Sequence, residues 1–304
     1  MEQKYTGYLF VFFTGTESSD DDEQVYFAVS RDGLHWKDLN EGQPVLRSPV
    51  GDRGVRDPFL VRSVLDGKYR VIATDLKIYN NKNWDAAANH GSTSLVIWES
   101  DDLLHFKEPY TWDTGIKGAG CAWAPEVVYD EENKNYMVFW ASMTKDETGK
   151  AKQKIYQSHT KDFIKFTEPE LYIEREDHII DTTMIKVNDT YYRFSKDEVR
   201  AQIDMESGSS LSKDSFKKIE SEVLSSLHGV EGPEIFQFND REEWCLIVDE
   251  VDRGTGYRPL VTTSLESGDF RILSEDEYDY GKLKKRHGSV VNLTEEEMKR
   301  LLEL

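Results

Sequence analysis

Carboxylates stand at the start of several short apolar strands that recur along this chain. Asp57, Asp181 and Glu231 each open such a strand, Glu126 lies two positions inside another, and His287 opens a fifth. An apolar strand gains nothing in folding from a carboxylate at its start, and gathering carboxylates costs repulsion and desolvation. A site that tolerates this cost usually uses it, so these residues are the candidates for chemistry.

Hydrolysis of a glycosidic bond is the reaction that needs such a set. One carboxylic acid protonates the leaving oxygen, and a carboxylate on the other face of the sugar activates water or attacks directly. A third carboxylate nearby raises the pKa of the acid, which keeps it protonated near neutral pH. Any one of these residues alone is better explained as a strand cap. Three such residues at equivalent places in repeated strands that are arranged in a ring predict a catalytic site.

The strands that carry these residues belong to a repeat with three parts. The first part is the strand with the polar start. The second is an apolar strand after an Asp, Asn or Gly turn, as at residues 69–73 and 136–140, and the third ends in a Ser-Asp turn and an aromatic, as at residues 30–36 and 100–106. The first parts recur every roughly 51 to 68 residues, which with about four strands per unit is typical of β-propeller blades.

The two ends of the chain complete this repeat. The N-terminal segment has the second and third parts without a first, and the strand at residues 287–291 is a first part with nothing after it. Joined, they make one blade and leave no sheet edge open. The sequence therefore predicts an all-β fold, a single five-bladed β-propeller over residues 1–304. A short helix at about 294–303, with Thr294 as N-cap and Glu297 in a capping box, should pack against it.

The strand starts also resemble a known family. The chain resembles glycoside hydrolase family 43 over essentially its whole length, through four motifs in the right order: Arg56-Asp57-Pro58, Trp123-Ala124-Pro125-Glu126, Ile180-Asp181 and Val230-Glu231-Gly232-Pro233. The resemblance implies an inverting reaction with Asp57 as general base, Asp181 as the residue that orients the acid and tunes its pKa, and Glu231 as general acid. One departure is that Asp57 follows a partial blade, so the blade order is shifted by one.

Further residues are candidates for substrate contact. A sugar pocket needs an aromatic platform and polar groups, and the loop of residues 75–92 is longer than a hairpin requires. In a propeller the first strand of every blade lines a central channel. Glu234 is a rival to Glu231 as the acid, but its position along the strand is less favourable for pointing at the mouth of this channel. We expect the substrate-binding residues to be Arg56, Trp84, Trp123, Glu126 and His287.

Metal binding stays open at the level of sequence. In family 43 a histidine placed like His287 often faces a calcium ion or a water cluster, so calcium near His287 is conceivable. One histidine without a carboxylate cage does not define a metal site, because calcium prefers six to eight oxygen ligands. No cofactor is required by the predicted reaction.

The expected activity is exo-acting release of terminal L-arabinofuranose from arabino-oligosaccharides or arabinoxylan fragments. A β-D-xylosidase of the same family and a non-hydrolytic carbohydrate-binding propeller are the alternatives. Retaining fructosidases share the Arg-Asp-Pro motif, but they also need an N-terminal Asn-Asp-Pro nucleophile motif and a Glu-Cys acid motif, and this chain has neither. Mannoside phosphorylases would need a basic phosphate pocket, which the sequence does not reveal.

Composition limits the partners. The formal net charge of −20 argues against nucleic acid, and a neutral oligosaccharide is indifferent to it. The longest apolar run, residues 8–13, is too short to span a bilayer. The start of the chain has no signal-peptide pattern, which predicts a cytoplasmic protein unless a leader has been trimmed. Cys121 and Cys245 have no metal-binding spacing and read as half-buried free thiols, and the oligomeric state is not indicated.

Overall fold

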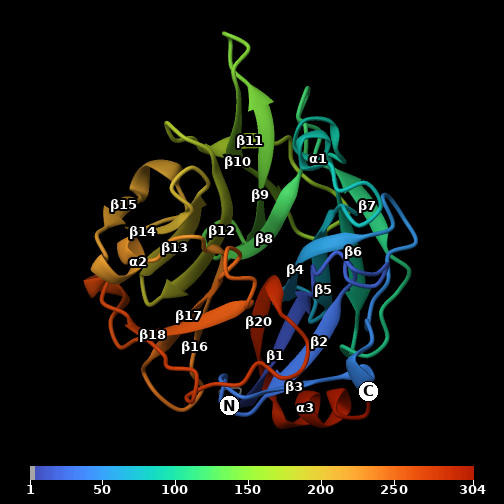
Figure 1. Cartoon of the computed structure of the whole chain (residues 1–304), viewed down its shortest axis with the longest axis vertical. Coiled ribbons are helices and arrows are strands. Elements are labelled where there is room, and N and C mark those ends of the chain that lie inside the picture. The colour runs from blue at the N-terminus through green and yellow to red at the C-terminus, as the bar shows by residue number, and fades with distance from the viewer. Residues whose placement is uncertain (1–3) are drawn as a thin grey trace.

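The computed structural model describes residues 4–304, which form five four-stranded antiparallel sheets arranged around a common centre (Figure 1). Four sheets are continuous in sequence. In each, the strands are given from the centre outward. The first sheet has β4 (Val55–Arg62), β5 (Tyr69–Asp75), β6 (Ser94–Ser100) and β7 (Tyr110–Asp113), and the second has β8 (Trp123–Asp130), β9 (Asn135–Lys145), β10 (Ala151–Thr160) and β11 (Glu170–Ile173). The third has β12 (Ile179–Val187), β13 (Thr190–Asp197), β14 (Gln202–Gly208) and β15 (Lys217–Ile219), and the fourth has β16 (Glu231–Gln237), β17 (Trp244–Asp249), β18 (Tyr257–Thr262) and β19 (Arg271–Ile272).

The fifth sheet joins the two ends of the chain. Its innermost strand, β20 (Arg286–Thr294), comes from the C-terminal end and pairs with β1 (Tyr5–Phe13), which is followed outward by β2 (Tyr26–Ser30) and β3 (Trp36–Asp38). The predicted five-bladed propeller and its mode of closure are therefore confirmed. Closure matters for the site because it places His287, on β20, beside residues of β4 and β16.

Helical segments are few and short. The α-helices are α1 (Trp84–His90), α2 (Glu222–Ser226) and α3 (Glu295–Leu301), and the 3₁₀ turns are η1 (Asn40–Gly42), η2 (Lys213–Ser215) and η3 (Leu265–Ser267). Thr294 and Glu297 form the capping box of α3 that the sequence predicts. No helix within residues 4–304 is long and apolar enough to cross a membrane.

The hydrophobic core is divided among the contacts between blades. Each neighbouring pair of blades shares one buried cluster, and a strand feeds two of them because its side chains alternate between faces. In β1, Leu9 and Val11 pack toward the β4–β7 blade, whereas Tyr8, Phe10 and Phe12 pack toward the β16–β19 blade. Continuous apolar runs in this sequence are thus strands buried on both sides.

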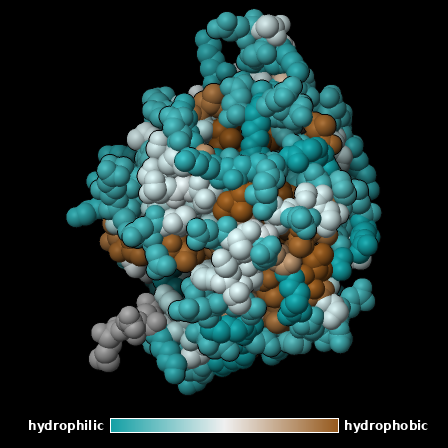
Figure 2. Space-filling model, turned by 90° about the vertical axis from the view of Figure 1, so that its left-hand side faces the viewer, coloured by the Kyte–Doolittle hydropathy of each residue, from teal (hydrophilic) through white to brown (hydrophobic). Residues whose placement is uncertain are grey.

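The surface is mostly hydrophilic. On the face shown in Figure 2, apolar side chains lie in separate patches between polar ones. Trp36 and Trp244 are buried between blades. Cys121 and Cys245 are free thiols as expected, but both are fully buried where half-burial was expected. The exposed large apolar residue nearest the site is Trp84, at 43% exposure.

Candidate active site

A β-bulge with a left-handed residue interrupts four of the five central strands near their first residues. The residues with positive φ are Asp57 (50°), Ala124 (49°), Asp181 (48°) and Gly232 (52°), and the pairing register shifts at each of them. The fifth central strand has a shift at the same level, opposite Phe12 and next to His287. Bulges re-aim side chains, and here the same device is repeated around the ring.

The bulges give the site residues two different positions. Asp57, Asp181 and His287 occupy the bulge position itself. Glu231 stands one residue earlier, level with Arg56 and with the residue before His287. Treating Asp57, Asp181 and Glu231 as strictly equivalent was therefore wrong by one residue for Glu231. Because of this one-residue offset, the carboxylate of Glu231 lies at a different level of the pocket from those of Asp57 and Asp181.

That pocket has a volume of about 360 Å³ and lies at the end of the channel where the central strands begin. Its volume is at the small end of the range for ligand sites, about 300–1,000 Å³, which suits a short sugar segment. It is lined by Phe13, Glu17, Arg56, Asp57, Leu76, Trp84, Trp123, Ile180, Asp181, Lys196, Glu198, Glu231, Val251, Arg286 and His287.

The predicted base, Asp57, is oriented by a hydroxyl of the second strand of its own blade. The Thr74 hydroxyl donates to Asp57 Oδ2 at 2.8 Å and accepts a hydrogen bond from the backbone N–H of Ala124 at 2.8 Å. Because the Ala124 amide occupies the acceptor side of the hydroxyl, its proton is directed at the carboxylate. Asp57 is thereby tied to the bulge of the next blade.

Asp181 is held by the blade that follows it. The backbone N–H of Gly232 donates to Asp181 Oδ2 at 3.0 Å. His287 Nδ1 lies 3.5 Å from Asp57 Oδ1 and 3.7 Å from Asp181 Oδ1, so one imidazole faces both carboxylates. Burial raises the pKa of Asp181 to about 6, an effect that His287 opposes and the charge of Glu231 reinforces.

Glu231 is surrounded by cations. Lys196 Nζ lies 2.7 Å from Glu231 Oε2, and a guanidinium nitrogen of Arg286 lies 2.5 Å from Oε1. Burial by itself would raise the pKa of Glu231, but Lys196 and then Arg286 outweigh it and lower that pKa to about 2. Arg286 is in turn anchored on Asp249, which is fully buried.

The aromatic side of the pocket comes from two tryptophans. Trp84, the first residue of α1, meets Trp123 edge to face, with ring centroids 6.2 Å apart. The guanidinium of Arg56 lies 4.9 Å from the Trp84 ring centroid and 2.9 Å from a carboxylate oxygen of Glu23. The long loop of residues 75–92 thus contributes a wall of the pocket, as expected from its length.

Two glutamates of the central strands lie outside this pocket. Glu126 was expected to contact substrate, but it does not line the pocket and is buried deeper in the channel, because the bulge at Ala124 shifts it beyond the mouth. Glu234, the weaker candidate for the acid, accepts from Val290 N at 2.7 Å and from Thr183 at 3.2 Å. Burial raises the pKa of both, that of Glu234 to about 8.

The residues do not fit a calcium site. Among residues 4–304, no three His, Cys, Asp or Glu side chains gather in a way that could hold a metal ion. His287 is the nitrogen donor that the sequence singled out, whereas calcium takes six to eight oxygens. No step of the chemistry below depends on calcium.

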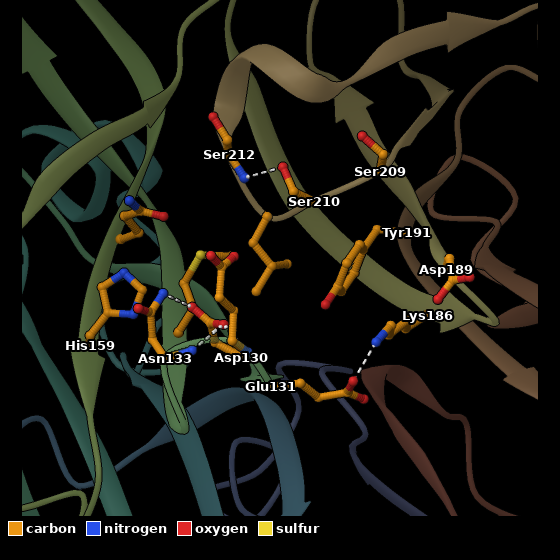
Figure 3. Close-up of a pocket in the computed structure, with 14 residues that line it drawn as sticks. Asp130, Glu131, Asn133, His159, Lys186, Asp189, Tyr191, Ser209, Ser210 and Ser212 are labelled. Carbon is orange, nitrogen blue, oxygen red and sulfur yellow. Dashed lines mark hydrogen bonds and ion pairs between the residues drawn. The ribbon is translucent and has the colours of Figure 1, made fainter.

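A larger groove of about 600 Å³ lies elsewhere, between the β8–β11 and β12–β15 blades (Figure 3). Asp130, which lines it, ends β8, whereas Trp123 begins that strand at the acidic pocket, so about 20 Å separate them. Three of its charged groups are already engaged: Asp130 closes a turn with Asn133, and Lys186 pairs with Glu131 at 2.6 Å, as the dashed lines show. The smaller pocket is the candidate active site.

Sequence reasoning missed two of the three cations of the pocket, Lys196 and Arg286, whereas Arg56 was expected there. Lys196 lies on β13, the second strand of its blade, where no motif marks it. Arg286 could have been found from its place before His287, which matches the place of Arg56 before Asp57. The two basic groups that the sequence did not reveal are therefore present, and each of them, like Arg56, is paired with a carboxylate.

Comparison with known proteins identifies the family. Residues 3–299 match the model of a family related to glycoside hydrolase family 43, described as a probable glycosyl hydrolase domain. The chain belongs to this family. The resemblance to family 43 seen in the sequence motifs is thereby supported over nearly the whole chain.

Individual relatives differ in name. An alpha-L-arabinofuranosidase of Bifidobacterium longum subsp. longum is 31% identical over 210 residues, which are 64% of this chain and 20% of that protein. The chain thus spans about one fifth of that curated relative. Among solved structures, an exo-beta-1,3-galactanase from Phanerochaete chrysosporium has a TM-score of 0.62 at 12% identity, covering 89% of this chain and 61% of its own.

A second solved structure, an endo-1,4-beta-xylanase from Bacteroides thetaiotaomicron VPI-5482, has a TM-score of 0.60 at 14% identity and covers 93% of both chains. At such identities these two structures show a common fold. They leave the substrate of this family-43-related propeller to be argued from its own site.

Proposed function

We propose that this propeller is an exo-acting, inverting glycoside hydrolase that releases terminal L-arabinofuranose from short arabino-oligosaccharides or arabinoxylan fragments. The observation that carries the proposal is the gathering of Asp57, Asp181 and Glu231, from three blades, in one small pocket beside Trp84 and Trp123. The relative named as an arabinofuranosidase supports the choice of sugar.

In the proposed reaction Asp57 acts as the general base. It takes a proton from a water molecule as the water oxygen bonds to the anomeric carbon. Glu231 gives its proton to the departing glycosidic oxygen as the bond from the anomeric carbon to that oxygen breaks. The products are the sugar with inverted configuration and a free alcohol. The proton on Asp57 then returns to solvent, and Glu231 takes up a proton from solvent.

The charge balance of the pocket favours this chemistry over transfer to phosphate. The lining has five carboxylates against three cations, namely Arg56, Lys196 and Arg286. A positively charged, oxocarbenium-like transition state is stabilised by such a surplus, whereas an inorganic phosphate anion is repelled. A phosphorylase is therefore the weaker reading even though basic groups are present.

The test is a panel of 4-nitrophenyl glycosides. We expect release of 4-nitrophenol from the α-L-arabinofuranoside at a kcat/KM at least about tenfold above that for the β-D-xyloside, since the two sugars differ in ring form and hydroxyl placement. A faster xyloside would move the proposal to the β-D-xylosidase alternative. No release from either, nor from the β-D-galactoside, would contradict hydrolysis and favour a carbohydrate-binding propeller.

A further inference from the structure

A general acid must carry a proton when the substrate is bound, yet both oxygens of Glu231 are held in ion pairs with Lys196 and Arg286. The two cations are not equally fixed. Arg286 also bonds Asp249, which is completely buried on β17, so this guanidinium has a rigid anchor. Movement of the Arg286 guanidinium away from Glu231 would break a buried ion pair, which costs free energy.

Lys196 has an alternative partner at the rim of the pocket. Its Nζ lies 2.7 Å from Glu231 and 2.6 Å from Glu198 Oε2. The Glu198 side chain is 41% exposed and stands in the turn that follows β13, whereas that of Lys196 is 6% exposed. Both glutamates line the pocket, so a sugar that enters it lies against the ammonium and both of its partners.

We propose that Lys196 is a positioning residue that sets the protonation state of Glu231 by dividing its ammonium between Glu231 and Glu198. With Lys196 on Glu231 the carboxylate is ionised and cannot act as an acid. When a sugar displaces the ammonium toward Glu198, Glu231 takes a proton from solvent and becomes the acid that protonates the leaving oxygen. This inference rests on the proposed function, because it assigns the proton of Glu231 to the glycosidic oxygen.

The other charges near Glu231 come from every blade strand packed around it and are the same in all the variants below. They are Arg56 and Asp57 on β4, Asp181 on β12, Asp249 on β17, Lys284 just before β20, and Arg286 and His287 at its start. Arg56 also has a second partner, Glu17, but that carboxylate is 23% exposed and lies 4.0 Å away, whereas Glu198 is 41% exposed and lies 2.6 Å from Lys196. Substitution of Lys196 therefore changes one of the charges around Glu231 and leaves the others in place.

Two substitutions should act in opposite directions. Lys196→Gln removes a cation within 3 Å of Glu231, so the pKa of Glu231 and the alkaline limb of the kcat/KM profile should rise by about 1 to 2 pH units. Glu198→Gln removes the competing partner and leaves Lys196 on Glu231, so the same limb should fall by about 0.5 to 1 unit. A loss of packing alone would lower activity at every pH without moving the limb in opposite directions.

The matched control is Lys186→Gln. Lys186 is a lysine in a 2.6 Å ion pair with Glu131 at the distant groove, so its loss should leave the profile unchanged. Glu198 lies at the rim, which makes Glu198→Gln the variant that folds even if Lys196→Gln does not. Unmoved limbs in both variants, or a shift in the same direction in both, would overturn the proposal.

A second measurement separates this inference from the proposed function. In the full chain with ¹³C-labelled glutamate, the carboxyl signal of Glu231, assigned by its absence in Glu231→Gln, is titrated without any sugar. Lys196→Gln should raise its pKa by about 1 unit or more. A shift with no hydrolysis of any glycoside would uphold the control by Lys196 and reject the glycosidase. An unchanged pKa of Glu231 together with hydrolysis of a glycoside would reject the control by Lys196 and uphold the glycosidase.

Discussion

Two aspartates in this pocket hold a backbone conformation that most residues avoid. Asp57 and Asp181 lie at φ of 50° and 48°, which costs an L-residue roughly 1–2 kcal/mol. Each carboxylate is in return fixed by a donor from a second strand or from the next blade, Thr74 or the N–H of Gly232. Strain that is kept in place by surrounding structure is typical of functional sites and motivates the role given to both residues.

Asp57→Asn tests the base directly. The amide keeps the size of the side chain and can still accept from Thr74, but it cannot take a proton from water. We expect kcat/KM on the aryl arabinofuranoside to fall by about 10²–10⁴ with little change in the melting temperature. Asp189→Asn, at the distant groove, serves as the matched control. Near-native turnover by Asp57→Asn would show that another group is the base.

Asp181→Asn has a consequence for stability against pH. Because the folded-state pKa is raised from 3.8 to about 6, the folded chain binds more protons than the unfolded chain between about pH 4 and 6. Native stability contributed by this group is therefore present at low pH and is lost as pH rises through that window. Asparagine lacks this loss, so the stability of the variant relative to the native chain should increase by up to about 3 kcal/mol from pH 4 to pH 7.

Urea denaturation of both chains at pH 4, 5, 6 and 7 measures this difference. The native and variant free energies of unfolding should converge or cross as pH rises. Curves that stay parallel across the four pH values would mean that Asp181 ionises with an ordinary pKa in the folded protein.

The bulges show what strand patterns do and do not predict at the scale of elements. Polar strand starts and turn residues were enough to place the central strands and to identify Asp57, Asp181, Glu231 and His287 as neighbours. Register within each strand depends on one extra residue per bulge, which has no sequence signature when the residue is Ala124. That is why Glu126 was expected in the pocket and lies below it.

Gly232 makes the bulge of β16 testable. Its φ is +52°, and a Cβ there would lie 2.8 Å from the Cβ of His287, so alanine would push the imidazole away from Asp57 and Asp181. Gly232→Ala should lower the free energy of unfolding by about 1–3 kcal/mol and reduce turnover by at least about tenfold.

Gly254→Ala is the control for the free-energy cost of placing alanine at a positive φ. Gly254 also has a positive φ, +67°, but a Cβ there would meet nothing within 4 Å. Its alanine variant should therefore lose about 1 kcal/mol of stability and keep full activity. Equal activity in the two variants would show that the contact between Gly232 and His287 is unimportant for the site.

At the scale of the whole molecule, the site exists because the ring is closed. His287 reaches Asp57 because β20 pairs with β1, and α3 fastens this blade to the next through Glu297, whose carboxylate lies 2.7 Å from Arg62. Closure was predictable, since the missing parts at the two ends of the repeat are complementary. Lys196 was not predictable, because an ion pair between blades leaves no periodic trace in a sequence. Arg286 was overlooked, although its place before His287 matches that of Arg56 before Asp57.

Removal of the closing strand should therefore abolish the fold. A chain that stops at Lys285 lacks β20 and α3, exposes the edge of β1 and uncovers apolar clusters on both sides of that strand. We expect it to show no cooperative thermal transition by circular dichroism. A chain that stops at Leu302, beyond α3, should melt within a few degrees of the full chain. A cooperative transition in the shorter chain would mean that four blades are stable without closure.

The central claim is that Asp57 and Glu231 act on opposite faces of a terminal sugar. ¹H NMR of the sugar first released from 4-nitrophenyl α-L-arabinofuranoside tests it most directly, because the anomeric signal is read before mutarotation. The account predicts β-L-arabinofuranose as the first product, with the α-anomer appearing later. Initial release of the α-anomer would mean retention through a covalent intermediate and would contradict the assignment of Asp57 as a general base.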